Sequence, residues 1–311
     1  MRRLLIVGFG DIAQRMVPLL AGRWRIYALA RDPRRFPPLR ALGVTPVRGD
    51  LDRPASLAPL AGLAQDVVHL APPPEQGARD TRTAHLVAAL AKGGSLPQHF
   101  VYISTSGVYG DCGGALVAET RPPRPQTERA WRRADAERQL REWGRRSGVR
   151  VSILRVPGIY AADRLPLARL RSGTPALRAD EDVYVNHVHA DDLARIVVAA
   201  LRRGAPGRMY NAADDVAIRM GDYFDLVADR FELPHPPRVS RAEAERLVAG
   251  NLRSFMGESR RLVNRRLKQE LRLKLRYPNV HHGVAGAARG EAAQASGTSR
   301  SRLADPESRH G

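Results

Sequence analysis

The sequence contains a single cysteine, Cys112, and no apolar run that approaches about 18 residues. One cysteine excludes an intrachain disulfide framework and a cysteine-rich zinc site. The lack of a long apolar run excludes a transmembrane helix. The amino-terminal stretch reaches glycines and Asp11 too soon for a signal peptide, and it has no small-residue cleavage site. We therefore expect a cytoplasmic protein without a membrane partner.

Lysine is the other scarce residue. Only Lys92, Lys268 and Lys274 are lysines, so 48 of the 51 basic residues are arginines. Against 32 acidic residues the net charge is +19, which favours an anionic ligand or nucleic acid as partner. The 311 residues, 43% of them hydrophobic, are enough to bury a core in one large domain or two modest ones.

Short apolar segments alternate with helical patterns in the first half of the chain. We expect strands at 4–7, 25–30, 43–47, 66–71, 100–104 and 149–156, and helices at 11–21, 79–92 and 127–144. Thr127 is the expected N-cap of the last helix. This alternation predicts parallel βαβ units, and therefore an α/β fold with a doubly wound parallel sheet.

The pattern becomes less regular after Pro157. We expect loop and a short helix over 161–182, strands at 183–188, 209–212 and 271–277, and helices at 191–202, 220–231 and 241–252. From about residue 286 onward almost nothing apolar is available for burial, which predicts a disordered tail.

The first motif is Gly8-Phe9-Gly10-Asp11-Ile12-Ala13, a G-x-G-x-x-A pattern between a predicted strand and a predicted helix. In this context Gly8 permits a tight turn, Gly10 lets the backbone approach a pyrophosphate, and Ala13 lets helix and strand pack closely. The helix N-terminus adds free N–H groups and the positive end of its dipole. The motif favours dinucleotide binding over an ordinary strand-to-helix turn.

The end of the second strand distinguishes NAD from NADP. An acid there would bind the ribose 2′-hydroxyl of NAD, whereas arginine suits the 2′-phosphate of NADP. Arg31 lies where the acid would be expected, Asp32 lies one place later, and Arg34 and Arg35 follow. We therefore expect NADP in preference to NAD. The alternative is that these arginines only face solvent on a loop.

Further short motifs lie at the expected strand ends in a consistent order. They are Gly49-Asp50-Leu51, His69-Leu70-Ala71, STSGVYG at 104–110, LRVPGIY at 154–160, VHADD at 188–192 and Arg276-Tyr277-Pro278. With these motifs the chain resembles the extended short-chain dehydrogenase/reductases, which include the NAD-dependent epimerases and dehydratases, over about residues 3–283.

The resemblance implies a domain organisation. A Rossmann-type domain would span 1–156 and be completed by about 183–212. A smaller α+β C-terminal substrate lobe would take most of 157–285, and 286–311 would form the tail.

The resemblance also implies roles for single residues. Besides the loop residues Gly8, Gly10, Asp11, Ile12 and Ala13, and besides Arg31, the expected cofactor-binding residues are Asp50, Leu51, Ala71, Pro72, Pro157 and Ile159. Asp50 and Leu51 would border the adenine, Ala71 and Pro72 the ribose and phosphate, and Pro157 to Ile159 the nicotinamide. Thr105 would replace the family's catalytic serine or threonine.

The chain departs from this family at its usual catalytic pair, Tyr-x-x-x-Lys. The residues four places before the three lysines are Ala88, Asn264 and Glu270, so the pair occurs nowhere. Alignment of the predicted helix 127–144 on Glu137 puts Arg129 where the tyrosine belongs and Arg133 where the lysine belongs.

Both arginines fall on the helical stripe that carries Ala136, Leu140 and Trp143, at ~100° per residue, so we expect both to point toward the site. Arginine does not donate a proton at neutral pH, because its pKa stays above about 12, but it binds phosphate or carboxylate bidentately. The hypothesis is that Arg133 partly replaces the ribose lysine and Arg129 binds an anionic group. The alternative is two surface arginines on a frayed first turn.

Weaker signals leave other assignments open. Tyr109 and Tyr160 could supply the acid, although both match structural tyrosines of the family. The alternation of His187, His189 and Asp191 suits metal ligands, but the acids at 191 and 192 also suit a helix start, and we expect no metal. Residues 253–276 carry nine basic and two acidic residues without the aromatics that stack on bases, which disfavours nucleic acid.

The sequence thus predicts an oxidoreductase that binds NADP, or NAD, and transfers hydride on a carbonyl or hydroxyl of a small molecule, for which an anionic substrate would suit the arginines. The alternative is a catalytically inactive protein that binds NAD(P) and signals by conformation. The missing tyrosine favours this alternative, and the retained lobe motifs favour the enzyme. A homodimer is left open.

Overall fold

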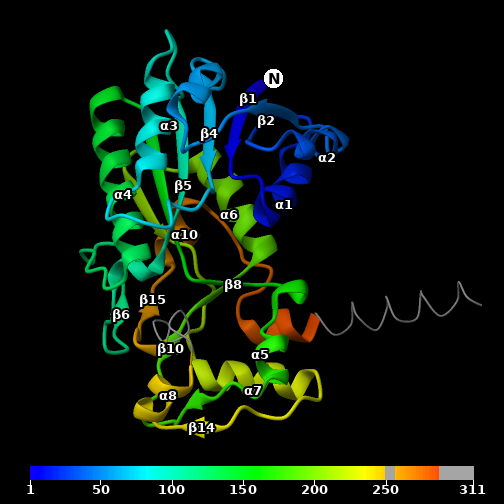
Figure 1. Cartoon of the computed structure of the whole chain (residues 1–311), viewed down its shortest axis with the longest axis vertical. Helices are drawn as coiled ribbons and strands as arrows, with labels where there is room; N and C mark the ends of the chain where they lie inside the picture. Colours follow the sequence, from blue (N-terminus) through cyan, green and yellow to red (C-terminus); the bar gives the residue numbers. More distant parts are fainter. Residues whose placement is uncertain (249–255, 287–311) are drawn as a thin grey trace, which may run out of the picture.

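Seven parallel strands form the central sheet of the computed structural model, which describes residues 1–248 and 256–286 (Figure 1). The strands are β1 (Arg2–Val7), β2 (Trp24–Ala30), β3 (Thr45–Arg48), β4 (Asp66–His69), β5 (His99–Thr105), β7 (Arg150–Val156) and β12 (Arg208–Asn211). Their order is β12-β7-β5-β4-β1-β2-β3, and every neighbouring pair is parallel. This confirms the predicted α/β fold of Rossmann type.

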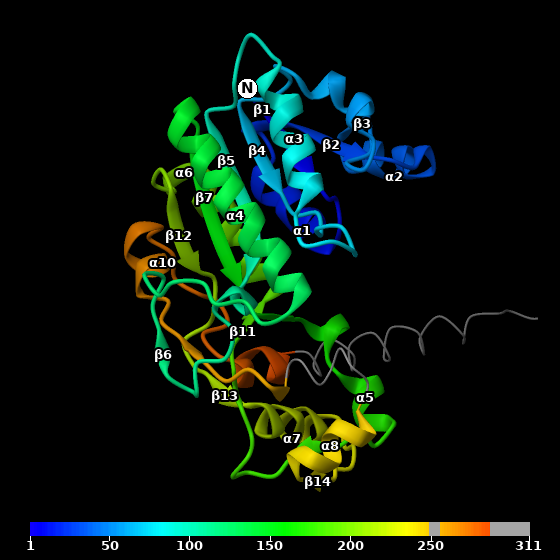
Figure 2. The ribbon, with the colours of Figure 1, turned by 60° about the vertical axis from the view of Figure 1, so that its left-hand side comes forward.

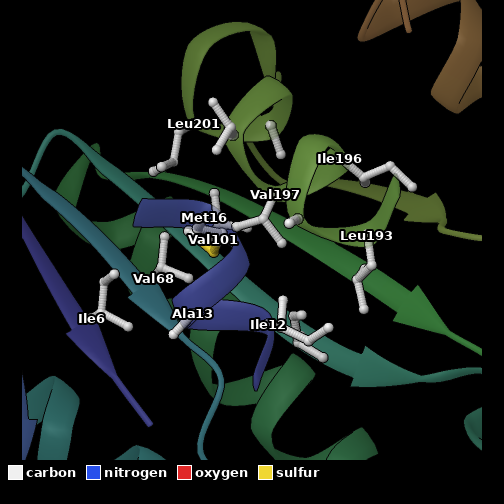
Figure 3. Packing of buried hydrophobic residues seen from close by; sticks show 14 of the residues in the cluster. Ile6, Ile12, Ala13, Met16, Val68, Val101, Leu193, Ile196, Val197 and Leu201 are labelled. Atoms are coloured by element: carbon white, nitrogen blue, oxygen red, sulfur yellow. The ribbon is translucent and has the colours of Figure 1, made fainter. Parts of the chain in front are cut away.

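Helices cover both faces of the sheet, which is why its strands are apolar throughout: Leu4 to Val7 are all completely buried. Helices α1 (Asp11–Leu20) and α6 (Ala190–Arg203) pack on one face, where Met16 and Val197 meet Val68 and Val101 (Figure 3). Helices α3 (Thr81–Ala91) and α4 (Glu128–Ser147) pack on the other face.

The order of the strands creates a switch point between β1 and β4. From β1 the chain proceeds outward through β2 and β3, and from β4 it proceeds the opposite way through β5, β7 and β12. The loops that follow β1 and β4 therefore lie side by side: the carbonyl of Val7 accepts from the amides of Leu70 at 2.7 Å and Ala71 at 3.0 Å. Ligands of doubly wound sheets bind in the crevice at such a point.

A smaller α+β lobe lies beyond the carboxyl ends of the strands, toward which their arrowheads point in Figure 2. Its elements are β8 (Gly158–Tyr160), η4 (Ala162–Arg164), α5 (Leu167–Arg171), β9 (Ala176–Leu177), β10 (Tyr184–Val185), β13 (Ile218–Arg219), α7 (Met220–Arg230), β14 (Arg238–Val239) and α8 (Arg241–Leu247). Tyr160, Leu177, Phe224 and Val227 belong to its own apolar core.

Shorter elements complete the chain. They are η1 (Pro33–Arg35), α2 (Phe36–Ala41), η2 (Pro54–Leu60), η3 (Ser106–Tyr109), β6 (Leu116–Val117), β11 (His187–His189), β15 (Arg261–Leu262) and α10 (Arg265–Glu270). None of the helices in the described part of the chain has both the length and the apolarity that a membrane crossing requires.

Helix α4 begins as predicted. The hydroxyl of Thr127 accepts from the amide of Ala130 at 3.2 Å, which makes Thr127 the N-cap. The helix then continues for 20 residues, to Gly148, whose left-handed φ of 76° ends it.

The predicted strand at 271–277 is wrong. Its apolar alternation is real, because Leu271 and Leu275 are buried against the core beside α6. Its carbonyls, however, are bonded by arginine side chains of α6 and not by a neighbouring strand: Arg203 donates to the carbonyl of Leu271 at 2.7 Å, and Arg195 to that of Lys274 at 3.0 Å. A period-2 pattern indicates one buried face, which an irregular segment can also have.

Two other predictions change in extent. The strand predicted at 183–188 is divided into β10 and β11 by Asn186, whose amide donates to the carbonyl of Arg260 and whose oxygen accepts from Leu262. The helix predicted at 241–252 ends at Leu247, and residues 249–255 lie outside the described residues. The tail predicted from residue 286 falls almost wholly on 287–311, also outside them.

Candidate functional site

The glycine loop lies at the switch point, between β1 and α1. Gly8 has φ +93°, and a Cβ there would lie 2.4 Å from the amide nitrogen of Ala71, so only glycine fits. Gly10 is the N-cap of α1 without a side-chain cap, and a Cβ built on it would meet nothing within 4 Å. Open space therefore lies in front of an uncapped helix N-terminus, which fits a pyrophosphate group.

The following loop residues differ in what they can offer. The side chains of Ile12 and Ala13 are buried in the core against the sheet, so only their backbone amides are available to a ligand. Asp11 keeps its carboxylate at the surface, where it pairs with Arg15 at 2.8 Å and with Arg164 at 3.0 Å.

Arginines surround the end of β2. Arg31 is exposed, and Asp32 is bound to the backbone amide and guanidinium of Arg34. Arg35 reaches back to the glycine loop, where its Nη2 donates to the carbonyl of Phe9 at 2.8 Å. The sequence motif did not single out Arg35, because the contact depends on how η1 folds after the strand.

The residues expected along the adenine, ribose and phosphate form one continuous edge. Asp50 donates its amide to the hydroxyl of Ser56, and Leu51 is buried in the core. Pro72 is exposed, and Ala71 is buried. Arg82 joins the two loops, because it pairs with Asp52 at 2.7 Å and donates to the carbonyls of Pro72 and Pro73, both at 3.3 Å.

Arg133 lies between the carboxyl ends of β4 and β5. It is 6% exposed, and its Nη1 donates to the carbonyls of Ile103 at 2.8 Å and Ala71 at 3.3 Å and to the hydroxyl of Tyr102 at 3.0 Å. Its Nε is buried without a partner in the described part of the chain. A buried cation held only by neutral oxygens is costly, which points to a functional reason for its position.

Arg129 lies one turn before Arg133 and is exposed, whereas Arg133 is buried. Partial burial, and then the charge of Arg133, lower the pKa of the Arg129 guanidinium. The carboxylates of α4 pair with other arginines: Glu128 with Arg132, Asp135 with Arg138, Glu137 with Arg155, and Glu142 with Arg145 and Arg146. A cation in the first helical turn also opposes the helix dipole.

Thr105 ends β5 and caps η3. Its Oγ1 accepts from the amide of Gly107 at 3.2 Å, which leaves the hydroxyl proton free to be donated. Beneath it, Ser104 donates to Glu137 at 2.6 Å, and the same carboxylate is bound by Arg155 at 2.6 Å. Glu137 and Arg155 are almost fully buried, so this pair joins α4 to β5 and β7 from inside the fold.

The two tyrosines that could have supplied an acid are both engaged. The hydroxyl of Tyr109 donates to Asn211 at 2.8 Å, and that of Tyr160 donates to the carbonyl of Asn279 at 3.1 Å. Burial raises the pKa of both phenols. Each tyrosine therefore has a structural role.

Pro157 and Ile159 lie along the start of the lobe, where β8 runs parallel to β11 and pairs Gly158 with His187. Behind this ladder lies an acid that the sequence motifs did not indicate. Asp214 is 3% exposed, neither of its carboxyl oxygens has a hydrogen bond of normal length to a described residue, and burial raises its pKa to about 8. Burial lowers the pKa of the adjacent His187 to about 4.

The alternation of His187, His189 and Asp191 has no metal-site counterpart. The rings of the two histidines pack on tyrosines, His187 on Tyr223 and His189 on Tyr277. Among residues 1–248 and 256–286, no three His, Cys, Asp or Glu side chains are grouped as metal ligands.

The family model described as NAD dependent epimerase/dehydratase family matches residues 4–213. A search of curated proteins found no match.

Solved structures resemble the chain over almost its whole length. A functionally unknown conserved protein from Silicibacter pomeroyi DSS is 29% identical, with a TM-score of 0.75, and the match covers 95% of this chain and 99% of that one. MoeE5 in complex with UDP-glucose and NAD is 21% identical, with a TM-score of 0.72 and coverages of 94% and 99%. The dTDP-glucose 4,6-dehydratase of Bacillus anthracis str. Ames in complex with NAD is 15% identical, with a TM-score of 0.76 and coverages of 95% and 98%.

Proposed function

Because the chain belongs to the NAD dependent epimerase/dehydratase family, we propose that it is an NADP-preferring oxidoreductase that transfers hydride on a carbonyl or hydroxyl of a small molecule. The observation that carries this proposal is the open space before the uncapped N-terminus of α1, at the switch point of the sheet. MoeE5 and the dehydratase share the fold and hold NAD, which supports a dinucleotide here.

The preference for NADP rests on the arginines after β2. Arg31 is exposed where the ribose 2′-position is expected, and Arg35 is anchored beside it on the glycine loop. Asp32 is already bound by Arg34, so it does not compete for a ribose hydroxyl. Two guanidinium groups suit a 2′-phosphate.

The remaining site residues would orient the reactants. The nicotinamide, when bound, supplies or accepts the hydride. Arg133 would hold the ribose from its position beside the carbonyl of Ala71. Thr105 would donate a hydrogen bond from its hydroxyl to the substrate oxygen, and the exposed Arg129 would bind an anionic group of the substrate. Since the phenols of Tyr109 and Tyr160 are engaged, the proton is expected to come from water.

A second candidate is a sensor that binds NAD(P) without catalysis. It is favoured by the same pair of arginines, because neither Arg129 nor Arg133 donates a proton at neutral pH. In both proposals the Rossmann part binds the dinucleotide, and the lobe receives a second molecule.

A titration with NADPH and NADH, followed by nicotinamide fluorescence, tests the proposal. We expect NADPH to bind at least ten times more tightly, and Arg31→Gln with Arg35→Gln to remove that preference while NADH binding stays unchanged. Binding of neither nucleotide contradicts both candidates. Oxidation of bound NADPH by any of a panel of aldehydes and ketones supports the enzyme, and binding without turnover supports the sensor.

A further inference from the structure

Five charged side chains join the glycine loop to the lobe. Arg15 of α1 pairs with Asp11 at 2.8 Å, with Asp191 at the start of α6 at 2.7 Å, and with Asp163 of η4 at 3.1 Å. Arg164, the last residue of η4, pairs with Asp11 at 3.0 Å. The lobe is thereby bound to the first turn of the helix on which the dinucleotide is expected.

Asp11 creates an electrostatic difficulty for that ligand. Its carboxylate stabilises the helix N-terminus, but a pyrophosphate at the same place would face a like charge. Arg15 divides its charge among three carboxylates, so it neutralises Asp11 only in part. Within the described residues Arg164 pairs with Asp11 alone, so it supplies a second positive charge beside this carboxylate.

Arg164 has N–H donors besides the one that binds Asp11. In the part of the chain that the structure describes, only its Nη1 is engaged by a carboxylate, and its side chain is 38% exposed. Its segment follows β8, and residues Pro157 to Ile159, at the start of that strand, are expected beside the nicotinamide. The same stretch of chain therefore runs from the nicotinamide end of the proposed site to its phosphate end.

We propose that Arg164 is a further cofactor-binding residue: it holds Asp11 through Nη1 and presents its remaining N–H groups to the pyrophosphate. Arg164 thus adds a residue of the lobe to a site that is built mainly on the sheet. A bound dinucleotide would therefore restrain the lobe where it joins the sheet domain. This inference rests on the proposed function.

Affinity measurements on Arg164→Gln test the proposal. Kd is measured for NADPH and NADH by fluorescence, and for ADP-ribose, which has the pyrophosphate but no nicotinamide, by calorimetry. We expect all three to bind about tenfold more weakly, which corresponds to about 1.4 kcal/mol. The matched control is Arg171→Gln, which removes one exposed positive charge from the same lobe and should leave each Kd within about twofold.

Two further measurements separate a direct contact from a general effect. Arg164→Lys keeps the charge but lacks the planar fork of guanidinium donors, so its Kd should fall between wild type and Arg164→Gln. Hydrogen exchange of residues 158–167 should slow when NADPH saturates the wild type, and should slow less in Arg164→Gln at equal saturation. Thermal unfolding of the ligand-free variants shows whether each of them folds. If Arg164→Gln does not fold, the Kd values of Arg164→Lys test the proposal.

The outcomes also separate this inference from its premise. Wild-type protein that binds none of the three ligands contradicts the proposed function. Wild-type protein that binds them, together with an Arg164→Gln variant that binds them equally well, contradicts the role of Arg164 and leaves the proposed function standing.

Discussion

Burial of the carboxyl group of Asp214 raises its pKa to about 8, from 3.8 in an unfolded chain. The folded state therefore keeps a proton that the unfolded state releases between about pH 4 and pH 8. The stability that this proton contributes is fully present below about pH 4 and is lost as the pH rises through about 8. Asp214 thus destabilises the fold in alkaline solution.

Replacement of Asp214 by asparagine removes this proton linkage. Relative to wild type, the free energy of unfolding of Asp214→Asn should rise with pH between about 4 and 8, by up to about 1.4 kcal/mol per pH unit. Urea unfolding at pH 5, 7 and 8.5 measures the difference. Asp180→Asn, which changes an exposed carboxyl in the lobe, is the control and should show no such slope. A constant difference for Asp214→Asn would show that the carboxyl ionises in the folded state.

Gly8 and Gly10 offer a matched pair of alanine substitutions. Alanine at position 8 needs φ +93° and puts Cβ against the backbone of Ala71, so we expect a loss of about 2–4 kcal/mol in unfolding free energy. Alanine at position 10 meets no protein atom and should fold normally, but its methyl group occupies the space where the pyrophosphate is expected. Thermal unfolding and NADPH titration of both variants separate these effects; normal NADPH affinity in Gly10→Ala would contradict the proposed site.

The glycine loop could be predicted from the sequence because its requirements are local: a tight turn and a helix start within six residues. The burial of Asp214 could not be predicted, since an aspartate after a short strand has the same local pattern whether it is exposed or buried. Its burial is produced by β11 and other elements distant in the sequence. Arg35 was missed for a related reason, because its contact with Phe9 depends on the path of η1.

At the scale of elements, α4 is attached to the sheet by a buried ion pair as well as by apolar contacts. Glu137 and Arg155 are 3% and 1% exposed. Removal of one partner would leave the other charge uncompensated in the interior, so Glu137→Leu or Arg155→Leu alone should cost about 3–5 kcal/mol of unfolding free energy. Urea unfolding of both single variants and of the double variant measures the coupling, and the double variant should lose far less than the sum.

The surface carboxylate Glu142, on the same helix, is the control for this cycle. Its arginine contacts of 3.7 and 3.9 Å are exposed, so Glu142→Gln should change the unfolding free energy by less than about 0.5 kcal/mol. Additive losses at Glu137 and Arg155 would mean that the two side chains stabilise the fold independently, contrary to the geometry of the pair.

The sequence pattern predicted helices and strands correctly where they have regular neighbours. The prediction failed where a segment has no such neighbours. The helix at α4 was predicted with its N-cap, because capping and periodicity are local properties. The segment at 271–277 has the alternation of a strand, but Arg195 and Arg203 supply its hydrogen bonds. Nothing in the segment itself indicates that its partners are side chains.

At the scale of the whole molecule, much of the arginine content has a structural use. Guanidinium groups donate to carbonyls of irregular segments, as Arg35, Arg203 and Arg261 do at Phe9, Leu271 and Gly114. Lysine could not replace them at equal geometry, because it lacks the planar set of five donors. The excess of arginine therefore does not by itself indicate a nucleic acid, as the charge of +19 first suggested.

The same charge should give salt two opposite effects. A net charge of +19 repels itself, and added salt screens this repulsion, so Tm should rise as NaCl increases from about 0.05 to 0.5 M. NADPH affinity should fall over the same range, because Arg31, Arg35 and Arg164 would bind its phosphates through screened charges. Thermal unfolding and NADPH titration at each salt concentration measure both responses, and equal concentrations of sucrose control for solute effects. A Tm that falls with salt would mean that attractive ion pairs outweigh the net repulsion, and an affinity independent of salt would remove these arginines from the phosphate contacts.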